Sequence, residues 1–325
     1  MRKLTALLLL LALLTGCTAN TPPETTVPTQ APAVSVPETT EAPETTEATE
    51  ETQPDFSWKE EVLVVHYIDI GQADCMLLEC GGETMLIDGG YADRAQEVVA
   101  YLESQNIDKL ELVVGTHPHG DHIGATPAVM AAYETDQVWS GPITYTNETV
   151  INFRNAVADQ DLTIHYPQPG ETYELGQALV TVLGPVKSYY EDVNDLSLVL
   201  MVEFGETRFL FTGDMEMMAE DDMLDYWGDE SVFRADVLKV GHHGSYSSTG
   251  YRLLRAVLPT YGVICVGGNN DYGHPHDEPI SRLQDAEVTI YRTDKMYDIM
   301  AVSDGYDITF TWENQYAQPW TPDAA

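Results

Sequence analysis

Basic side chains are few in this sequence: 15 lysines and arginines stand against 53 aspartates and glutamates, which gives the 325 residues a formal net charge of −38. A surface of this sign repels polyanions, whereas tight binding to nucleic acid depends on lysines and arginines that neutralise phosphates. Nonspecific binding to nucleic acid is therefore disfavoured. A bound pair of metal ions would reverse the sign of the charge locally.

Cysteine is also scarce, with four in the whole chain, and one of them, Cys17, belongs to an N-terminal motif. The other three are too few and too scattered for a sulfur-rich metal site. Cys75 and Cys80 lie five positions apart, so a disulfide between them would need a tight hairpin. We predict instead that Cys75, Cys80 and Cys265 are buried free thiols.

Only one long apolar run is present, "LTALLLLLALL" at residues 4–14, directly after Arg2 and Lys3. It is short for a membrane span and has the form of the apolar region of a secretory signal. The run ends in "LTGC", which resembles the bacterial lipobox, in which the cysteine is lipidated and becomes the new N-terminus after cleavage. We predict a lipoprotein signal peptide at residues 1–16 and lipidation of Cys17. The alternative is an uncleaved anchor or an ordinary secretory signal.

Large apolar side chains are almost absent from residues 18–55, which read "TANTPPETTVPTQAPAVSVPETTEAPETTEATEETQPD". Such a segment cannot offset the entropy of ordering by burying surface. We predict a disordered Thr/Pro/Glu-rich tether at residues 17–57, stiffened by proline and extended by repulsion between glutamates. The protein is expected at the extracellular face of a bacterial cell membrane, which it contacts through the lipid anchor only.

After the tether, strand-like runs rich in valine, leucine and isoleucine are bounded by glycine, aspartate or asparagine. They cover residues 61–70, 75–80, 83–90, 110–117, 178–185, 196–204, 207–214, 235–243 and 261–268, and helical patterns cover residues 93–105, 215–227 and 248–258. The mixture predicts one α/β domain at residues 58–315, with two sheets and helices outside them, and a C-terminal tail at residues 316–325. Consecutive strands at residues 178–214 predict antiparallel hairpins.

A dense group of polar side chains follows one of these strands in "THPHGDHIGA", residues 116–125. Imidazole and carboxylate groups are ligands of Zn²⁺ and Mn²⁺. Alternating positions let His117 and His119 face one ion while Asp121 and His122 face a neighbouring ion. The pattern H-x-H-x-D-H predicts a metal site, and the alternative is a hydrogen-bonded turn.

Two further groups also stand at the ends of apolar strands. Asp214, in "FLFTGDME", either bridges two divalent ions or caps the helix that follows it. Of His242 and His243, in "VLKVGHHGS", one can complete the shell of the second ion while the other donates a proton or holds a substrate oxyanion. The spacing alone does not decide which histidine has which role.

Two weaker elements complete the candidate site. Asn194 and Ser197, in "NDLSLVL", either contact the site or make a turn. His274 and His276 lie on a loop rich in glycine, proline and asparagine, where a histidine can contact a substrate, and His274 is the stronger candidate. We expect the catalytic side chains to be Asp121, His243 and His274.

The order of these motifs, "LIDGG", "THPHGDH", "TGD" and "VGHHGS", resembles that of the metallo-β-lactamase fold hydrolases. More narrowly, "YIDIGQADCMLLECGGETMLIDGG", "NDLSLVLMVEFGETRFLFTGDME", "VLKVGHHGSYSST" and "YGHPHDEPISRLQDAEVTIYRTD" are similar to the soluble hydrolase domain of ComEC-type competence proteins and its stand-alone secreted relatives. The resemblance covers nearly all of residues 62–310 and implies a four-layer αββα sandwich with a dinuclear site along one edge of the two sheets. It assigns His117 and His119 to one ion, Asp121 and His122 to the other, and Asp214 to the position that bridges them. It assigns His242 to the later ligand position, with His243 beside it. Asp88 would not bind a metal ion itself but would orient the side chains that do.

Two departures from the family pattern qualify these expectations. Many superfamily members place a histidine before the strand that precedes the bridging aspartate, where this chain has "NDLS". The first ion is therefore expected to take Asn194 or water instead. The full competence proteins carry transmembrane channel segments, and none follows the signal here, so we do not expect this chain to conduct DNA.

The resemblance implies hydrolysis by a metal-bound hydroxide. Two ions, Zn²⁺ or Mn²⁺, lower the pKa of a bound water molecule toward about 7 and stabilise the charge that develops in the transition state. A phosphodiester is the expected substrate, and the acidic surface favours a small molecule or a cell-envelope substrate, such as a teichoic acid, over long nucleic acids. A lactone, a thioester or a β-lactam stays open, as does a tethered module that uses its metal ions only for binding.

Overall fold

The computed structural model describes residue 59 and residues 61–322, which belong to one compact unit, Pro54–Ala325. The signal peptide, Cys17 and the tether up to residue 57 lie outside the described residues and stay predictions. Among the residues that the structure describes, no helix has the length and the apolar character needed to cross a membrane.

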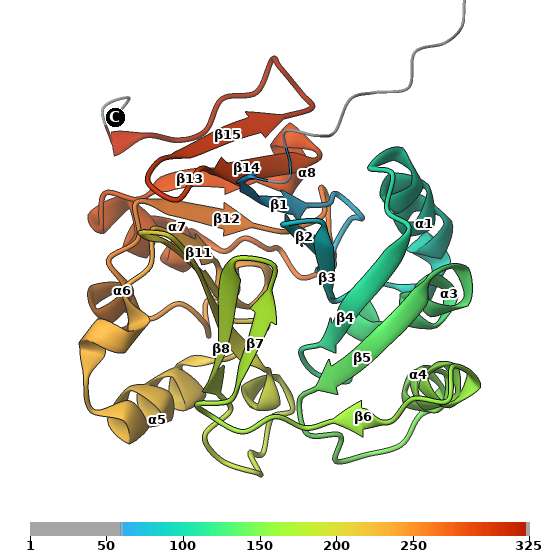
Figure 1. Ribbon diagram of the computed structural model, residues 1–325. Helices are drawn as coiled ribbons and strands as arrows, with labels where there is room; N and C mark the ends of the chain where they lie inside the picture. The colour runs from blue at the N-terminus through green and yellow to red at the C-terminus, as the bar shows by residue number, and fades with distance from the viewer. Residues whose placement is uncertain (1–58, 60, 323–325) are drawn as a thin grey trace, which may run out of the picture. The chain divides into compact units, whose positions relative to one another are not determined.

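The first sheet has eight strands and starts as an antiparallel arrangement, because β1 pairs with β2 and β2 pairs with β3 in opposite directions. From β3 to β6, neighbouring strands are parallel and helices connect them. In spatial order the strands are β15 (Ile308–Trp312), β14 (Ile299–Ser303), β1 (Leu63–Tyr67), β2 (Met76–Cys80), β3 (Glu83–Ile87), β4 (Lys109–Gly115), β5 (Glu134–Ser140) and β6 (Ile164–His165) (Figure 1).

The second sheet has seven strands, of which the four earliest in the chain are antiparallel and the next three parallel. The antiparallel hairpins predicted at residues 178–214 are therefore confirmed. In spatial order the strands are β13 (Thr289–Arg292), β12 (Tyr261–Ile264), β11 (Val237–Lys239), β10 (Thr207–Phe211), β9 (Val199–Phe204), β8 (Ala178–Gly184) and β7 (Thr172–Leu175).

The alternation of side chains along the strands divides the apolar core into layers. In β1, Leu63 and Val65 point into the space between the sheets, where they join Val202 and Phe209 of the second sheet in one buried cluster. The intervening residues of other strands, such as Leu86, point outward and are covered by helices. Each sheet therefore has one face toward the other sheet and one face toward helices.

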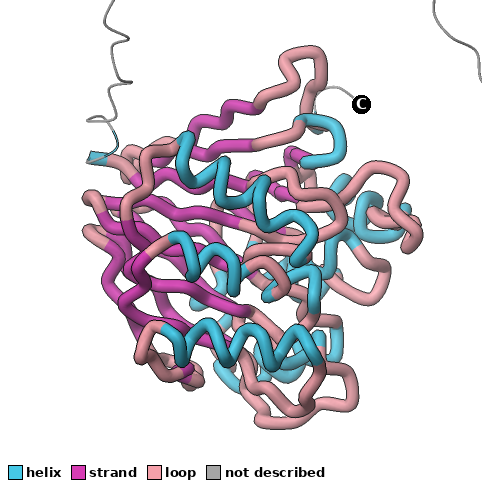
Figure 2. The backbone as a smooth tube through the Cα atoms, turned by 90° about the vertical axis from the view of Figure 1, so that its right-hand side faces the viewer, coloured by secondary structure: helices cyan, strands magenta, loops and turns pink. Residues whose placement is uncertain are grey.

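Helices cover the two outer faces, and those of the first sheet lie in front of the strands in Figure 2. On the first sheet, α1, α3 and α4 supply the buried side chains of the outer cluster, and on the second sheet α5, α6 and α7 do so. The predicted four-layer αββα sandwich is confirmed. The helices are α1 (Ala95–Ser104), α2 (Gly120–Ile123), α3 (Thr126–Ala132), α4 (Glu148–Asp159), α5 (Met217–Trp227), α6 (Tyr251–Val257), α7 (Asp277–Asp285) and α8 (Thr293–Met296).

The carboxyl ends of two pairs of parallel strands carry the polar motifs. β3 and β4 end just before Asp88 and the "THPHGDH" loop, and β10 and β11 end just before Asp214 and the "GHHG" turn. Parallel neighbours end at the same edge of a sheet, and this is where binding sites form in α/β folds. The topology thus brings together motifs that are about 150 residues apart in the chain.

The prediction of free thiols is confirmed: Cys75, Cys80 and Cys265 are buried and unpaired with one another. Near the C-terminus, the backbone of Trp320 forms a short antiparallel bridge with Ile290 of β13. The Trp320 side chain packs against the outer cluster of the second sheet. Part of the segment after residue 315 therefore contacts the domain.

Candidate metal centre

The loop after β4 folds its three imidazoles against one another. His117 and His122 are fully buried, with ring centroids 4.1 Å apart. The Nε2 atom of His117 lies 2.9 Å from the Nδ1 atom of His119. These two nitrogens are therefore close enough to bind the same metal ion.

Asp88 fixes this loop from behind. Its carboxylate accepts hydrogen bonds from the backbone N–H of Thr116 at 2.8 Å and from the Thr116 hydroxyl at 2.7 Å. Its Oδ2 atom also lies 2.8 Å from Nδ1 of His122. With Nδ1 held by Asp88, Nε2 of His122 faces Asp214, and the family resemblance implies an orienting role of this kind for Asp88.

Asp214 stands at the centre of the site. Its Oδ2 atom lies 3.2 Å from Nε2 of His122 and 3.5 Å from Nε2 of His243. Nε2 of His243 is in turn 3.5 Å from Oδ2 of Asp121. One ligand atom from each of Asp121, His122, Asp214 and His243 lies within 4.8 Å of the others, so these four side chains can hold one metal ion.

The two consecutive histidines point to different surroundings. His243 is buried, and its Nδ1 atom lies 3.0 Å from the carbonyl oxygen of Cys265. His242 is partly exposed, and its Nδ1 atom lies 3.1 Å from Glu216, while its Nε2 atom is 3.7 Å from Asp214. Both histidines line the cavity, but only His243 belongs to the four-residue cluster, so the geometry favours His243 as the ligand, whereas the family's motif order favours His242.

Asn194 and Ser197 both lie in the site. The Ser197 hydroxyl is 3.3 Å from Nδ1 of His117 and accepts a hydrogen bond from the backbone N–H of Asp214 at 3.0 Å. Asn194 is buried, lines the same cavity as Asp214, and its Oδ1 atom has no hydrogen-bond partner among the described residues. Asn194 also begins the short 3₁₀ turn Asn194–Leu196, so these residues make a turn and lie beside the cluster at once. Asp214 does not cap α5, because the N-cap residue of that helix is Glu216.

The cavity above these groups has a volume of about 310 Å³. Its walls come from the loops at both sheet edges, and Tyr91, Tyr272 and His274 line it together with Asp121 and Asp214. His276 is not part of the lining, and its Nδ1 atom accepts a hydrogen bond from the backbone N–H of Tyr246 at 3.0 Å. Of the two histidines on this loop, the structure places only His274 at the cavity.

Charge at the site favours a bound cation. Burial alone would lower the pKa of His243, but Asp214 and Asp74 raise it to about 10. Burial would likewise lower the pKa of His122, yet the carboxylates of Asp214 and Asp88 raise it well above its ordinary value. The carboxylates therefore hold positive charge in the site, which suits a divalent ion.

Unpartnered buried atoms give an independent test of whether a metal ion fits. Buried polar atoms in proteins nearly always have a hydrogen-bond partner. Among the described residues, Nε2 of His122, Nε2 of His243 and Oδ1 of Asp214 have none. All three are atoms that bind Zn²⁺ or Mn²⁺, so the donor set fits a divalent metal centre.

Sequence reasoning missed Asp74 and Lys239, which are both fully buried and lie 2.7 Å apart behind His243. The available signal was a lysine inside the apolar run "ADVLKVGHH" and an aspartate just before the run "CMLLEC". A charged residue in such a place needs a buried partner. Sequence spacing does not identify that partner, because 165 positions separate the two residues.

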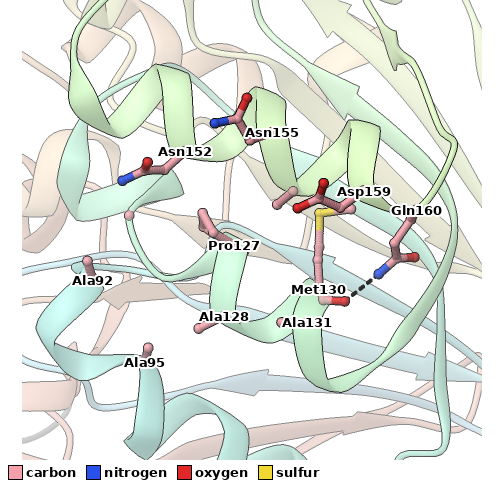
Figure 3. A pocket seen from close by; sticks show the side chains of 12 residues that line it. Ala92, Ala95, Pro127, Ala128, Met130, Ala131, Asn152, Asn155, Asp159 and Gln160 are labelled. Carbon is pink, nitrogen blue, oxygen red and sulfur yellow. Dashed lines mark hydrogen bonds between the residues drawn. The ribbon is translucent and has the colours of Figure 1, made fainter.

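A larger cavity of about 540 Å³ lies between α1, α3 and α4, and its lining is drawn in Figure 3. Short alanine side chains form much of its wall, and Gln160 donates a hydrogen bond to the carbonyl oxygen of Met130 there. The lining contains no histidine and one carboxylate, that of Asp159. The smaller cavity is therefore the candidate site, since it alone of the two adjoins the ligand cluster.

Comparison with known families identifies the class of protein. The family model described as the metallo-β-lactamase superfamily matches residues 68–268, so the chain belongs to this superfamily. It has the metal-dependent hydrolase fold of that superfamily.

Among curated proteins, the chain is similar to competence proteins. It is 27% identical to the ComE operon protein 3 of Bacillus subtilis, in an alignment that covers 71% of this chain and 32% of the relative. It is 28% identical to the competence protein ComA of Neisseria gonorrhoeae, covering 70% and 30%, and 28% identical to the recombination protein 2 of Haemophilus influenzae, covering 67% and 26%. The chain thus matches about a quarter to a third of the length of these relatives.

Among solved structures, the fold is similar to that of the CmlA β-hydroxylase E377D mutant, with a TM-score of 0.51 and 15% identity over 76% of this chain and 54% of the other. It is also similar to the metallo-β-lactamase fold protein YhfI from Bacillus subtilis, with a TM-score of 0.50 and 12% identity over 71% of this chain and 96% of the other. At these identities the likeness shows the fold alone.

Proposed function

We propose that this protein is an exported, lipid-anchored dinuclear metallohydrolase that cleaves a phosphodiester. One observation carries the metal centre in this proposal: the unpartnered ligand atoms of three loops gather at Asp214, beside a 310 Å³ cavity. A module that only binds a ligand has no need for this many metal-binding groups beside an open cavity.

The side chains divide into two ligand sets that share Asp214. His117 and His119 would hold the first ion, with the buried amide oxygen of Asn194 as a further donor. The second ion would lie among Asp121, His122 and His243. Zn²⁺ and Mn²⁺ both suit these nitrogen and oxygen ligands.

Two divalent ions supply an activated water at neutral pH and neutralise the charge that develops on the substrate. The side chains of the protein hold the ligands and the substrate in position. Ser197 and Asp88 orient the rings of His117 and His122 from behind. His242, whose ring faces Glu216 on one side and the cavity on the other, is placed to contact a substrate oxygen.

The cavity offers hydrogen-bond donors, which suits the oxygens of a phosphodiester. The amide oxygen of Gln72 accepts a hydrogen bond from the backbone N–H of Gly267 at 3.1 Å, so its amide nitrogen donates to Nδ1 of His274 at 3.2 Å. His274 must then carry its proton on Nε2. Burial, together with His242, lowers the pKa of His274 to about 4, so the ring is a neutral donor at pH 7.

Replacing His274 with alanine is expected to lower kcat/KM for a phosphodiester by roughly 10- to 100-fold, because a hydrogen bond to a charged oxygen contributes about 1.5–3 kcal/mol. The number of bound metal ions should not change. His276→Ala is the matched control, since it removes a histidine from the same loop outside the cavity. Equal losses in the two variants would show that the loop acts only through its fold.

The substrate class is tested by turnover. The purified protein is given bis(4-nitrophenyl) phosphate, a generic lactone and a β-lactam, each with added Zn²⁺ or Mn²⁺. The proposal predicts metal-dependent release of 4-nitrophenol as the fastest of the three reactions. Faster opening of the lactone or the β-lactam would overturn the phosphodiester assignment.

The lipid anchor is tested separately through Cys17. In "LTGC" the cysteine supplies the thiol that is lipidated, so Cys17→Ala should move the protein from the membrane fraction to soluble or precursor forms. Cell fractionation followed by immunoblotting measures this change, and Cys80→Ala is a control that keeps the motif intact. A Cys17→Ala protein of mature size that stays in the membrane fraction would contradict the anchor.

A further inference from the structure

We propose that Asp74 is a positioning residue for the metal ligand His243. Lys239, which comes from the other sheet, balances the negative charge of Asp74. The inference rests on the proposed function, because it takes His243 as a ligand of the second ion. It assigns a role to two fully buried charged residues that the ligand sets leave unexplained.

Asp74 touches both of the loops that supply ligands to the second ion. It precedes β2 in the first sheet, and its backbone N–H donates a hydrogen bond to the carbonyl oxygen of Asp121 at 3.2 Å. Its Oδ1 atom lies 3.2 Å from Nδ1 of His243, which comes from the second sheet. A carboxylate oxygen of Asp74 also lies within 4.8 Å of ligand atoms of Asp88 and His122.

Lys239 reaches Asp74 from the other sheet. It is the last residue of β11, and its Nζ atom lies 2.7 Å from Oδ2 of Asp74 and donates to the carbonyl oxygen of Val240 at 2.9 Å. Removing two charges from water is costly, and replacing such a buried pair by apolar residues is often neutral or stabilising. A role beyond stability is therefore the better explanation for this pair.

The contact between Asp74 and His243 explains why the buried charge is kept, because it orients the His243 ring. The backbone of His243 has a φ of 51°, in the left-handed region, and such a conformation persists only where surrounding contacts hold the residue in place. Nδ1 donates a hydrogen bond to the carbonyl oxygen of Cys265 at 3.0 Å, and the Asp74 carboxylate lies 3.2 Å from the same nitrogen, where its negative charge stabilises the N–H group. This fixes the proton on Nδ1 and leaves Nε2 free to bind a metal ion, as carboxylates behind metal-bound histidines do elsewhere.

The experiment compares Asp74→Asn with Glu79→Gln in the full-length protein. Glu79 is a matched control in β2, because it is also buried and contacts a lysine and a histidine, Lys59 at 2.5 Å and His66 at 2.8 Å. The double variant Asp74→Asn with Lys239→Met removes both charges and leaves no unpaired buried lysine if the single variant fails to fold. Zn²⁺ affinity is measured by competition with a chromophoric chelator, and thermal unfolding of the metal-free proteins reports their stability.

The wild type is expected to bind two Zn²⁺ ions, and both Asp74 variants should bind one of them about 10- to 100-fold more weakly. The affinity for the other ion should not change, and Glu79→Gln should bind both ions as the wild type does. The visible spectrum of the Co²⁺-substituted protein should change in the Asp74 variants alone. Tight binding of both ions by the Asp74 variants, or equal weakening in Glu79→Gln, would overturn the inference, whereas a wild type that binds no Zn²⁺ would overturn the proposed function itself.

Discussion

Replacing Asp214 with asparagine is expected to abolish hydrolysis, with a loss of roughly 10³-fold or more, and to remove most of the bound metal. Asparagine has nearly the same shape but lacks the charge, and in the proposed centre both ions share this one carboxylate. The buried imidazoles of His122 and His243 would also lose the group that lies 3.2 and 3.5 Å from their Nε2 atoms. Activity toward a small phosphodiester and metal analysis of the purified variant measure the two effects.

Asp236→Asn provides the matched control for this substitution. Asp236 precedes β11, at the opposite end of that strand from the site, and its side chain accepts a hydrogen bond from the backbone N–H of Arg208 at 2.8 Å. The control should keep wild-type metal content and activity. An Asp214→Asn protein that resembles this control in both respects would remove Asp214 from the centre of the site.

The second large effect concerns the size of the substrate. A small bis-aryl phosphodiester is expected to be hydrolysed far more readily than plasmid DNA at physiological salt, because an acidic protein has few lysines and arginines to neutralise phosphates along a duplex. Short or single-stranded nucleic acids should fall between the two, since they reach the ions without a long basic track. The comparison is made with equal concentrations of phosphodiester bonds and the same added metal ion.

An Asp121→Ala variant is the control in this comparison, because a contaminating nuclease would not respond to it. Its activity toward the small substrate should disappear, since Asp121 belongs to the four-residue ligand cluster. Rapid degradation of plasmid that disappears with the same substitution would mean that the metal ions outweigh the surface charge. A competence-type nuclease would then be the better description of the function.

The sheet architecture could be predicted from the sequence where strands are apolar and end in a polar motif. The strands after which Asp88, His117, Asp214 and His243 follow are all of this kind. Strands at the sheet margins were harder to predict, because their burial alternates with exposed polar residues. β7 (Thr172–Leu175) and β15 (Ile308–Trp312) contain few fully buried residues, and their pairing comes from the neighbouring strand rather than from their own pattern.

The candidate site shows a similar limit. The density of histidine and aspartate in "THPHGDH" predicts the metal-binding loop, but the choice between His242 and His243 depends on the backbone. Both residues adopt left-handed φ angles of 48° and 51°, which turn the two rings toward different partners. Asp74 and Lys239 illustrate the same point, since their contact depends on how two sheets pack together.

Metal content measures the central claim most directly. The full-length wild-type protein and the Asp214→Asn variant are stripped with a chelator, dialysed against Zn²⁺ or Mn²⁺, freed of excess metal and analysed by elemental mass spectrometry. The cluster at Asp214 and the neighbouring pair His117 and His119 are the two proposed ligand sets, which predict close to two ions per wild-type chain and far fewer in the variant. A wild-type protein that stays metal-free after dialysis against both ions would contradict the account.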